Sequence, residues 1–193
     1  MRSSRLSRRV ANHEYDATTL EAMSVFSRSK AAMWRSGERT CARKRSLRGC
    51  ALRAPGVQAA SASVVKILGV ASCDRGIEGS GFVFAPGRVM TNAHVVAGVR
   101  EPNIDLDGQR LKAKVVVFDP NLDVAVLAVN NLNRTALAFD RTGERGQSGV
   151  ILGYPQNGPF DARAARIRSE ISMQSPDIYD QGQHIRKVFA LRG

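Results

Sequence analysis

The feature that most constrains this fold is a series of short β-rich runs that begins near residue 63. Gly, Pro, Asn and Asp, which are typical of turns, separate the runs. We expect strands at residues 63–70, 81–84, 88–91, 104–106, 111–118, 124–129 and 150–154. Residues 163–171 fit a helix and a strand equally well. Because no long amphipathic helix lies between the runs, their spacing predicts an all-β barrel or sandwich.

The first 56 residues differ in charge from the rest of the chain. They hold 13 of the 29 Lys and Arg residues but only 4 of the 17 acidic residues, so most of the net charge of +12 arises there. This composition predicts a basic N-terminal arm of low order over residues 1–56 and one folded domain over residues 57–193. Within the arm, Thr18 and Glu21 form a capping box before spaced apolar residues, which would also fit a short amphipathic helix.

The position of the basic charge also bears on partners and location. Because the excess lies in the arm, we predict no specific nucleic-acid partner and at most a weak association of the arm with a membrane. The start of the chain lacks the run of about 7 to 15 apolar residues of a signal peptide, and no stretch approaches the ~20 residues of a membrane span. Cys41, Cys50 and Cys73 match no zinc pattern, so no metal site is expected.

Two motifs carry residues of catalytic type. The run GSGF at 79–82 precedes TNAHVV at 91–96, and Asp123 opens an apolar run 29 residues after His94. Serine becomes a useful nucleophile when an imidazole takes its proton and a buried carboxylate orients that imidazole. Taken alone, His94 would be interpreted as a core histidine at a strand end, and Asp123 would be interpreted as a turn residue. Their order and spacing together favour a base and its orienting acid.

These motifs, with DPNL at 119–122 and LGYP at 152–155, resemble the trypsin-like serine proteases of the chymotrypsin fold. The resemblance covers about residues 63–192 and is strongest to the branch of HtrA proteases and mycobacterial periplasmic acid-resistance serine proteases. It implies a double β-barrel that hydrolyses polypeptide substrates with a His-Asp-Ser triad, in which His94 is the base and Asp123 its orienter. It implies no cofactor and no metal, and a periplasmic or extracytoplasmic location.

The chain departs from the family pattern at the nucleophile. The family serine lies in a G-[DN]-S-G-G turn after two further strands, here expected at 162–171 and 185–191, and no GxSGG occurs in the 193 residues. Ser148 leads directly into a strand only 25 residues after Asp123, which favours a turn residue over a nucleophile. We therefore expect a truncated, inactive peptidase domain with a complete first barrel at about 63–140 and a partial second barrel at about 146–193.

Three further expectations follow. A partial barrel would expose strand edges at 167–171 and 188–191, whose partners would lie past Gly193, so we expect self-association. Cys73 is expected either to pair with a cysteine outside the chain or to be a buried free thiol. The alternative function is a non-catalytic binding protein that uses the barrel as a scaffold and the basic arm to bind nucleic acid or an anionic membrane.

Overall fold

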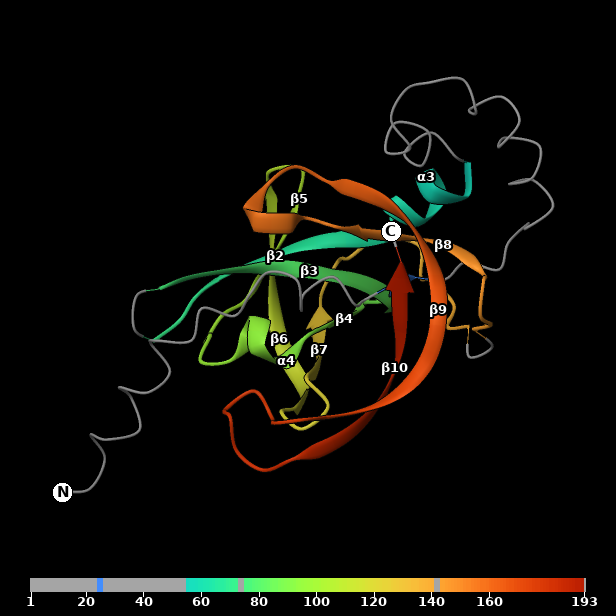
Figure 1. Ribbon diagram of the computed structural model, residues 1–193. Helices are drawn as coiled ribbons and strands as arrows, with labels where there is room; N and C mark the ends of the chain where they lie inside the picture. Colours follow the sequence, from blue (N-terminus) through green and yellow to red (C-terminus); the bar gives the residue numbers. More distant parts are fainter. Residues whose placement is uncertain (1–23, 26–54, 73–74, 141–142, 193) are drawn as a thin grey trace.

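The computed structural model describes residues 24–25, 55–72, 75–140 and 143–192 (Figure 1). Strands dominate this part of the chain, which confirms the predicted all-β class. The elements are β1 (Ser24–Val25), α3 (Pro55–Ser61), β2 (Val64–Val70), β3 (Gly76–Ala85), β4 (Arg88–Thr91), α4 (Ala93–Val96), β5 (Asn103–Leu106), β6 (Gln109–Asp119), β7 (Val124–Val129), β8 (Ser148–Gly153), η3 (Pro155–Asn157), β9 (Asp161–Ser175) and β10 (His184–Arg192).

The first unit is a closed antiparallel barrel. Its strands follow the order β2-β3-β4-β7-β6-β5, and β5 returns to β2 with Ile104 opposite Ile67. Successive side chains of a strand point to opposite faces, and along β7 every second residue is buried. The inward set forms one apolar core that includes Val65, Ile67, Val83, Val89, Ile104 and Leu127. Closure leaves this ring of strands without a free edge.

The second unit is an open sheet with the order β1-β8-β9-β10. The strand β9 is long and curved, and in Figure 1 it runs in orange from β8 towards β10. Its first part pairs with β8 and its second part with β10. A small apolar cluster lies between this sheet, α3 and the start of β2, and consists of Val57, Ala60, Val64, Val150, Leu152 and Ala162.

The expected open edges are paired on one side. Residues 167–171 and 188–191 pair with each other, as Ile167 with Leu191 and Ile171 with Val188. On the other side of β9, Ile167 exchanges backbone hydrogen bonds with Gly146 and Gln147 at 2.7 and 2.9 Å. Within the described residues, the edges without a strand partner include the outer edge of β10 and the part of β9 after Ile167.

The helices differ most from the sequence-based picture. His94 lies in the one-turn helix α4 instead of at a strand end, and α3 begins at Pro55, inside the predicted arm. Ser24 and Val25 form a strand where the capping box suggested a helix. The other predictions for the arm, and that for Cys73, lie outside the described residues. Across the residues that are described, every helix is too short or too polar to cross a membrane.

Ser80 of β3 joins the two units. Its Oγ accepts a hydrogen bond from the backbone N–H of Tyr154, which follows β8, at 2.8 Å. Its carbonyl oxygen accepts the hydroxyl of buried Thr91 of the barrel, also at 2.8 Å. Gly153 lies so close that a Cβ added there would be 2.8 Å from Ser80 Oγ. The open sheet is therefore anchored to β3 at Ser80, which also bonds to the last residue of β4, the strand that leads to His94.

Candidate active site

His94 projects from the barrel because the residues beside it are buried. The strand β4 ends at Thr91, Asn92 is extended, and α4 follows for a single turn. Ala93, Val95 and Val96 are buried in the barrel core, whereas the His94 side chain keeps 23% of its surface exposed. Apolar neighbours on the core side thus orient His94 away from the core.

Asp123 lies at the end of a tight turn before β7. The side chain of Asp119 accepts hydrogen bonds from the backbone N–H groups of Asn121 and Leu122, both at 2.9 Å. Asp123 itself has φ of 56°, in the left-handed region that non-glycine residues seldom adopt. Its side chain is 15% exposed. This backbone turn directs the carboxylate towards α4.

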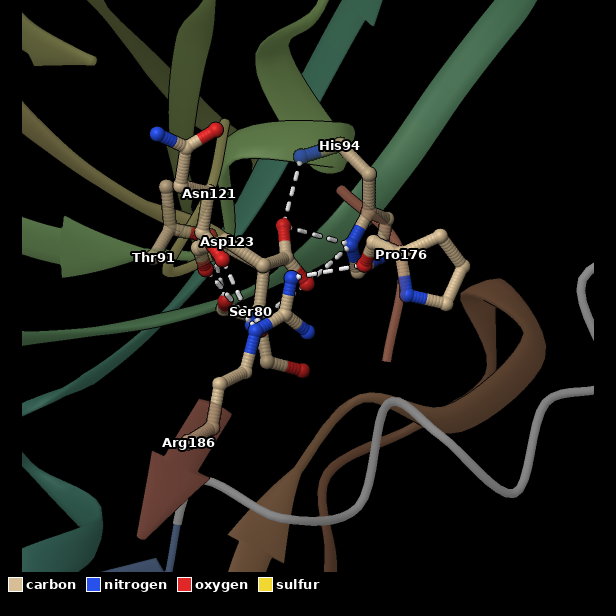
Figure 2. A network of polar contacts seen from close by, with 8 residues as sticks. Ser80, Thr91, His94, Asn121, Asp123, Pro176 and Arg186 are labelled. Atoms are coloured by element: carbon tan, nitrogen blue, oxygen red, sulfur yellow. Dashed lines mark hydrogen bonds and ion pairs between the residues drawn. The ribbon is translucent and has the colours of Figure 1, made fainter. Parts of the chain in front are cut away.

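The two sequence-predicted residues meet in a hydrogen-bonded pair (Figure 2). His94 Nδ1 lies 2.8 Å from Asp123 Oδ2 and 3.0 Å from Oδ1, and the His94 backbone N–H donates to Oδ1 at 3.0 Å. The Asn92 side-chain amide donates to Oδ2 at 3.2 Å and to the Asp123 carbonyl at 3.1 Å. A proton on Nδ1 facing the carboxylate makes Nε2 the basic nitrogen of the ring.

The environment keeps Asp123 ionised. Burial raises the pKa of this carboxyl, but the side-chain and backbone hydrogen bonds from His94 and the charges of His94 and Arg186 outweigh burial. The pKa therefore lies below its ordinary value of 3.8. At neutral pH the carboxylate is negative, and it can stabilise a positive charge on the imidazole next to it.

Ser148 lies in the open sheet, whereas His94 and Asp123 belong to the barrel. Two further residues near the pair, Asn92 and Arg186, were not predicted from the sequence. Ser148 is the exposed first residue of β8 and pairs with Arg166 of the open sheet. Asn92 lies within the motif around His94, so its position was the available signal. Arg186 of β10 acts on Asp123 from 63 positions later in the chain (186 − 123), and no local pattern reveals such a contact.

Within the described ranges, no group of three or more His, Cys, Asp or Glu side chains is arranged to hold a metal ion. His184 begins β10, on the open sheet, and lies next to Gly182. The hydrogen-bonded pair of His94 and Asp123 is the arrangement that supports acid–base chemistry.

Known proteins match this chain over the same region. The family model described as a trypsin-like peptidase domain matches residues 79–188, which include both members of the pair. The serine protease Rv3671c of Mycobacterium tuberculosis is 44% identical over 141 residues, which are 72% of this chain and 36% of that protein. A probable periplasmic serine endoprotease, DegP-like, of Halomonas elongata is 43% identical over 81 residues, 40% of this chain and 17% of that protein. The chain thus spans about a third or less of these relatives.

Solved structures agree with the sequence matches. The crystal structure of the Rv3671c protease in its active form matches with a TM-score of 0.69 at 44% identity, over 72% of this chain and 62% of that one. The HtrA-type protease AlgW with a tripeptide matches with a TM-score of 0.57 at 22% identity, over 70% and 48%, and shares the fold. The family model covers more than half of the chain, so the resemblance drawn from the motifs is confirmed. The chain belongs to the family of trypsin-like serine proteases.

Proposed function

We propose that this protein supplies the general base and its orienting carboxylate to a serine endopeptidase that hydrolyses peptide bonds in polypeptides. The observation that carries the proposal is the contact of His94 Nδ1 with both carboxylate oxygens of Asp123, at 2.8 and 3.0 Å. Family membership supports the reaction class. The tight contact, beside a carboxyl with a lowered pKa, supports the assignment of roles to the two residues.

In this proposal the proton moves through Nε2 of His94. The imidazole takes the proton of a serine hydroxyl as the oxygen attacks the peptide carbonyl, and then gives that proton to the leaving amine. Asp123 stays ionised throughout, holds Nδ1–H and stabilises the imidazolium that forms between the two transfers. Asn92 keeps the carboxylate in place through its side-chain amide.

The proposed nucleophile is a serine outside residues 1–193. No GxSGG turn occurs within these residues, and Ser148 lies in the open sheet. In the chymotrypsin arrangement the nucleophile turn also supplies backbone donors for the oxyanion, and losing one such donor lowers kcat by about 10² to 10³. We therefore expect the polypeptide of residues 1–193 alone to lack peptidase activity.

The proposed location is periplasmic or extracytoplasmic. The Halomonas elongata relative is named a probable periplasmic endoprotease, and the match to it extends over 40% of this chain. Two fusions at the C-terminus of the protein test the location, one with a reporter enzyme that is active only outside the cytoplasm and one with a reporter that is active only in the cytoplasm. Activity of the cytoplasmic reporter alone would contradict the proposed location.

A chimera tests the catalytic proposal. Residues 1–193 are joined to the nucleophile-bearing C-terminal segment of the serine protease Rv3671c, and cleavage of casein and labelling by a fluorophosphonate are measured. We expect the chimera to be active and labelled, and the unextended chain to be neither. His94→Ala or Asp123→Asn should lower kcat by about 10⁴-fold. The matched control, His184→Ala, removes a histidine of the open sheet and should leave kcat unchanged.

Three outcomes would contradict the proposal. The first is stoichiometric labelling of the unextended chain at Ser148, and the second is a folded chimera whose kcat does not depend on His94. The third is a chimera that folds but neither cleaves nor becomes labelled. In that case, salt-sensitive binding of the 193-residue chain to nucleic acid or anionic vesicles, lost when the basic arm is removed, would favour the non-catalytic scaffold.

A further inference from the structure

The turn that presents Asp123 requires support from outside the barrel. Its backbone is left-handed at Asp123, with φ of 56°. Such a conformation persists when neighbouring structure over-determines it. Within the turn, Asp119 satisfies the N–H groups of Asn121 and Leu122. These local bonds leave the carbonyl oxygens of Pro120 and Asn121 for partners from another segment.

The connection between β9 and β10 supplies those partners. The backbone N–H of Ile178 donates to the Pro120 carbonyl at 3.3 Å, and Arg186 Nε donates to the Asn121 carbonyl at 2.8 Å. The side chain of Ile178 also packs against the apolar core of the barrel. The open sheet therefore reaches across to the turn that carries the orienting carboxylate.

The connection is itself held in shape, so it can act as a fixed support. The side chain of Asp177 accepts hydrogen bonds from the backbone N–H groups of Tyr179 and Gln181, both at 2.8 Å. Arg186 uses a second nitrogen to donate to the Pro176 carbonyl at 3.0 Å. A guanidinium presents several donors in a rigid planar fork. One side chain thus ties the connection to the Asp123 turn.

Arg186 also acts on the pair by its charge. The residue is half-buried, and Figure 2 shows its side chain among the residues around the pair of His94 and Asp123. Two charges lower the pKa of Asp123, that of His94 in α4 and that of Arg186. The same residue therefore fixes the backbone of the turn and favours the ionised carboxylate.

We propose that Arg186 is a positioning residue for the pair of His94 and Asp123. By bridging the Asn121 and Pro176 carbonyls, it locks the Asp123 turn onto the β9–β10 connection and holds the carboxylate at His94 Nδ1. The assignment rests on the proposed function in one respect, namely that this pair is the base and orienter of a peptidase. The geometry that Arg186 maintains is present in the 193-residue chain and can be measured without catalysis.

The test compares Arg186→Met and Arg186→Lys with the control Lys187→Met, which changes an exposed side chain at the next position of the same strand. In the full chain with isotope-labelled histidine and aspartate, NMR follows the His94 Nδ1 proton and the titration of the Asp123 carboxyl. We expect Arg186→Met to broaden or remove the Nδ1 proton signal and to raise the pKa of Asp123. Arg186→Lys keeps the charge but not the planar fork. It should therefore keep the pKa of Asp123 close to that of the wild type but retain little of the Nδ1 proton signal.

In the chimera, Arg186→Met should lower kcat by up to about 10²-fold with little change in KM, since small misplacements of catalytic groups have effects of that size. The proposal is overturned if Arg186→Met leaves the proton signal and the titration as in Lys187→Met, or lowers only the melting temperature. If Arg186→Met does not fold, Arg186→Lys decides: an unchanged Nδ1 signal overturns the proposal. An inactive chimera combined with altered NMR signals contradicts the proposed function and leaves the positioning role intact.

Discussion

The barrel and the open sheet organise apolar side chains in different ways. The barrel closes through the pairing of β2 with β5 and surrounds its core on all sides. The sheet of β1, β8, β9 and β10 stays open, and it relies on α3 and the start of β2 to cover a smaller cluster. Beyond that cluster, β9 and β10 expose Ile171, Met173 and Ile185. Closure therefore separates a unit whose own strands surround its core from one whose apolar cluster is covered by neighbouring elements.

The pair of His94 and Asp123 follows the same division. His94 and Asp123 both come from the closed unit, in the helix α4 that follows β4 and in the turn before β7. The open unit contributes Arg186 and the β9–β10 connection, which hold the turn before Asp123. The barrel thus supplies the chemical groups, and the sheet supports their placement.

The largest expected effect contrasts the two cores. Leu127 of the barrel is 0% exposed and Leu152 of the sheet is 7% exposed. Replacing a buried leucine with alanine costs about 2 to 5 kcal/mol, and the cost is higher where the surroundings cannot collapse into the cavity. We expect Leu127→Ala to lie near the top of this range and Leu152→Ala near the bottom in urea unfolding. Exposed Leu122→Ala is the control, and equal costs for the two buried positions would contradict the contrast.

The next effect concerns association through the open sheet. Ile185 of β10 is 74% exposed, and it lies on a strand whose outer edge has no described partner. A lysine there places a charge on an edge that could pair with another chain. We expect Ile185→Lys to weaken self-association about tenfold, or ~1.4 kcal/mol, in sedimentation velocity over a range of concentrations.

The matched control for this experiment is Val117→Lys. Val117 is 51% exposed, but it lies on β6 of the closed barrel, where it pairs with Val126 of β7. Its replacement should leave association unchanged. A strictly monomeric wild type, or equal effects of the two lysines, would show that the open edge does not drive association.

The smallest effect is the pH dependence contributed by Asp123. Its pKa in the folded chain lies below 3.8, so the unfolded chain takes up this proton at a higher pH than the folded chain. The resulting stabilisation is fully present above pH 3.8 and is lost as the pH falls through the folded pKa. The free energy of unfolding of the wild type minus that of Asp123→Asn should therefore decrease below pH 3.8. A constant difference across that range would contradict the lowered pKa.

Most of the fold could be predicted from the strand pattern, because the alternation of apolar residues and the turn residues are local properties of a sequence. The predicted ranges for β4 and β7 coincide with the observed strands. In contrast, α4 spans four residues, too few for helical periodicity to show. The His94–Asp123 pair was accessible through motif order, whereas the bond from Arg186 to Asn121 joins residues 65 positions apart and left no local signal. Contacts of this kind depend on how two units meet.

The bond between Ser80 and Tyr154 carries a consequence for how related sequences diverge. The hydroxyl of Ser80 occupies the space that a side chain at position 153 would need, since a Cβ there would come within 2.8 Å of it. A larger residue at position 153 therefore requires either that the Ser80 hydroxyl is absent or that it rotates away and gives up its bond to Tyr154. Among homologues the two positions should covary, with Gly at 153 favoured where Ser stands at 80. Positions 80 and 153 would then evolve together although they lie in separate units.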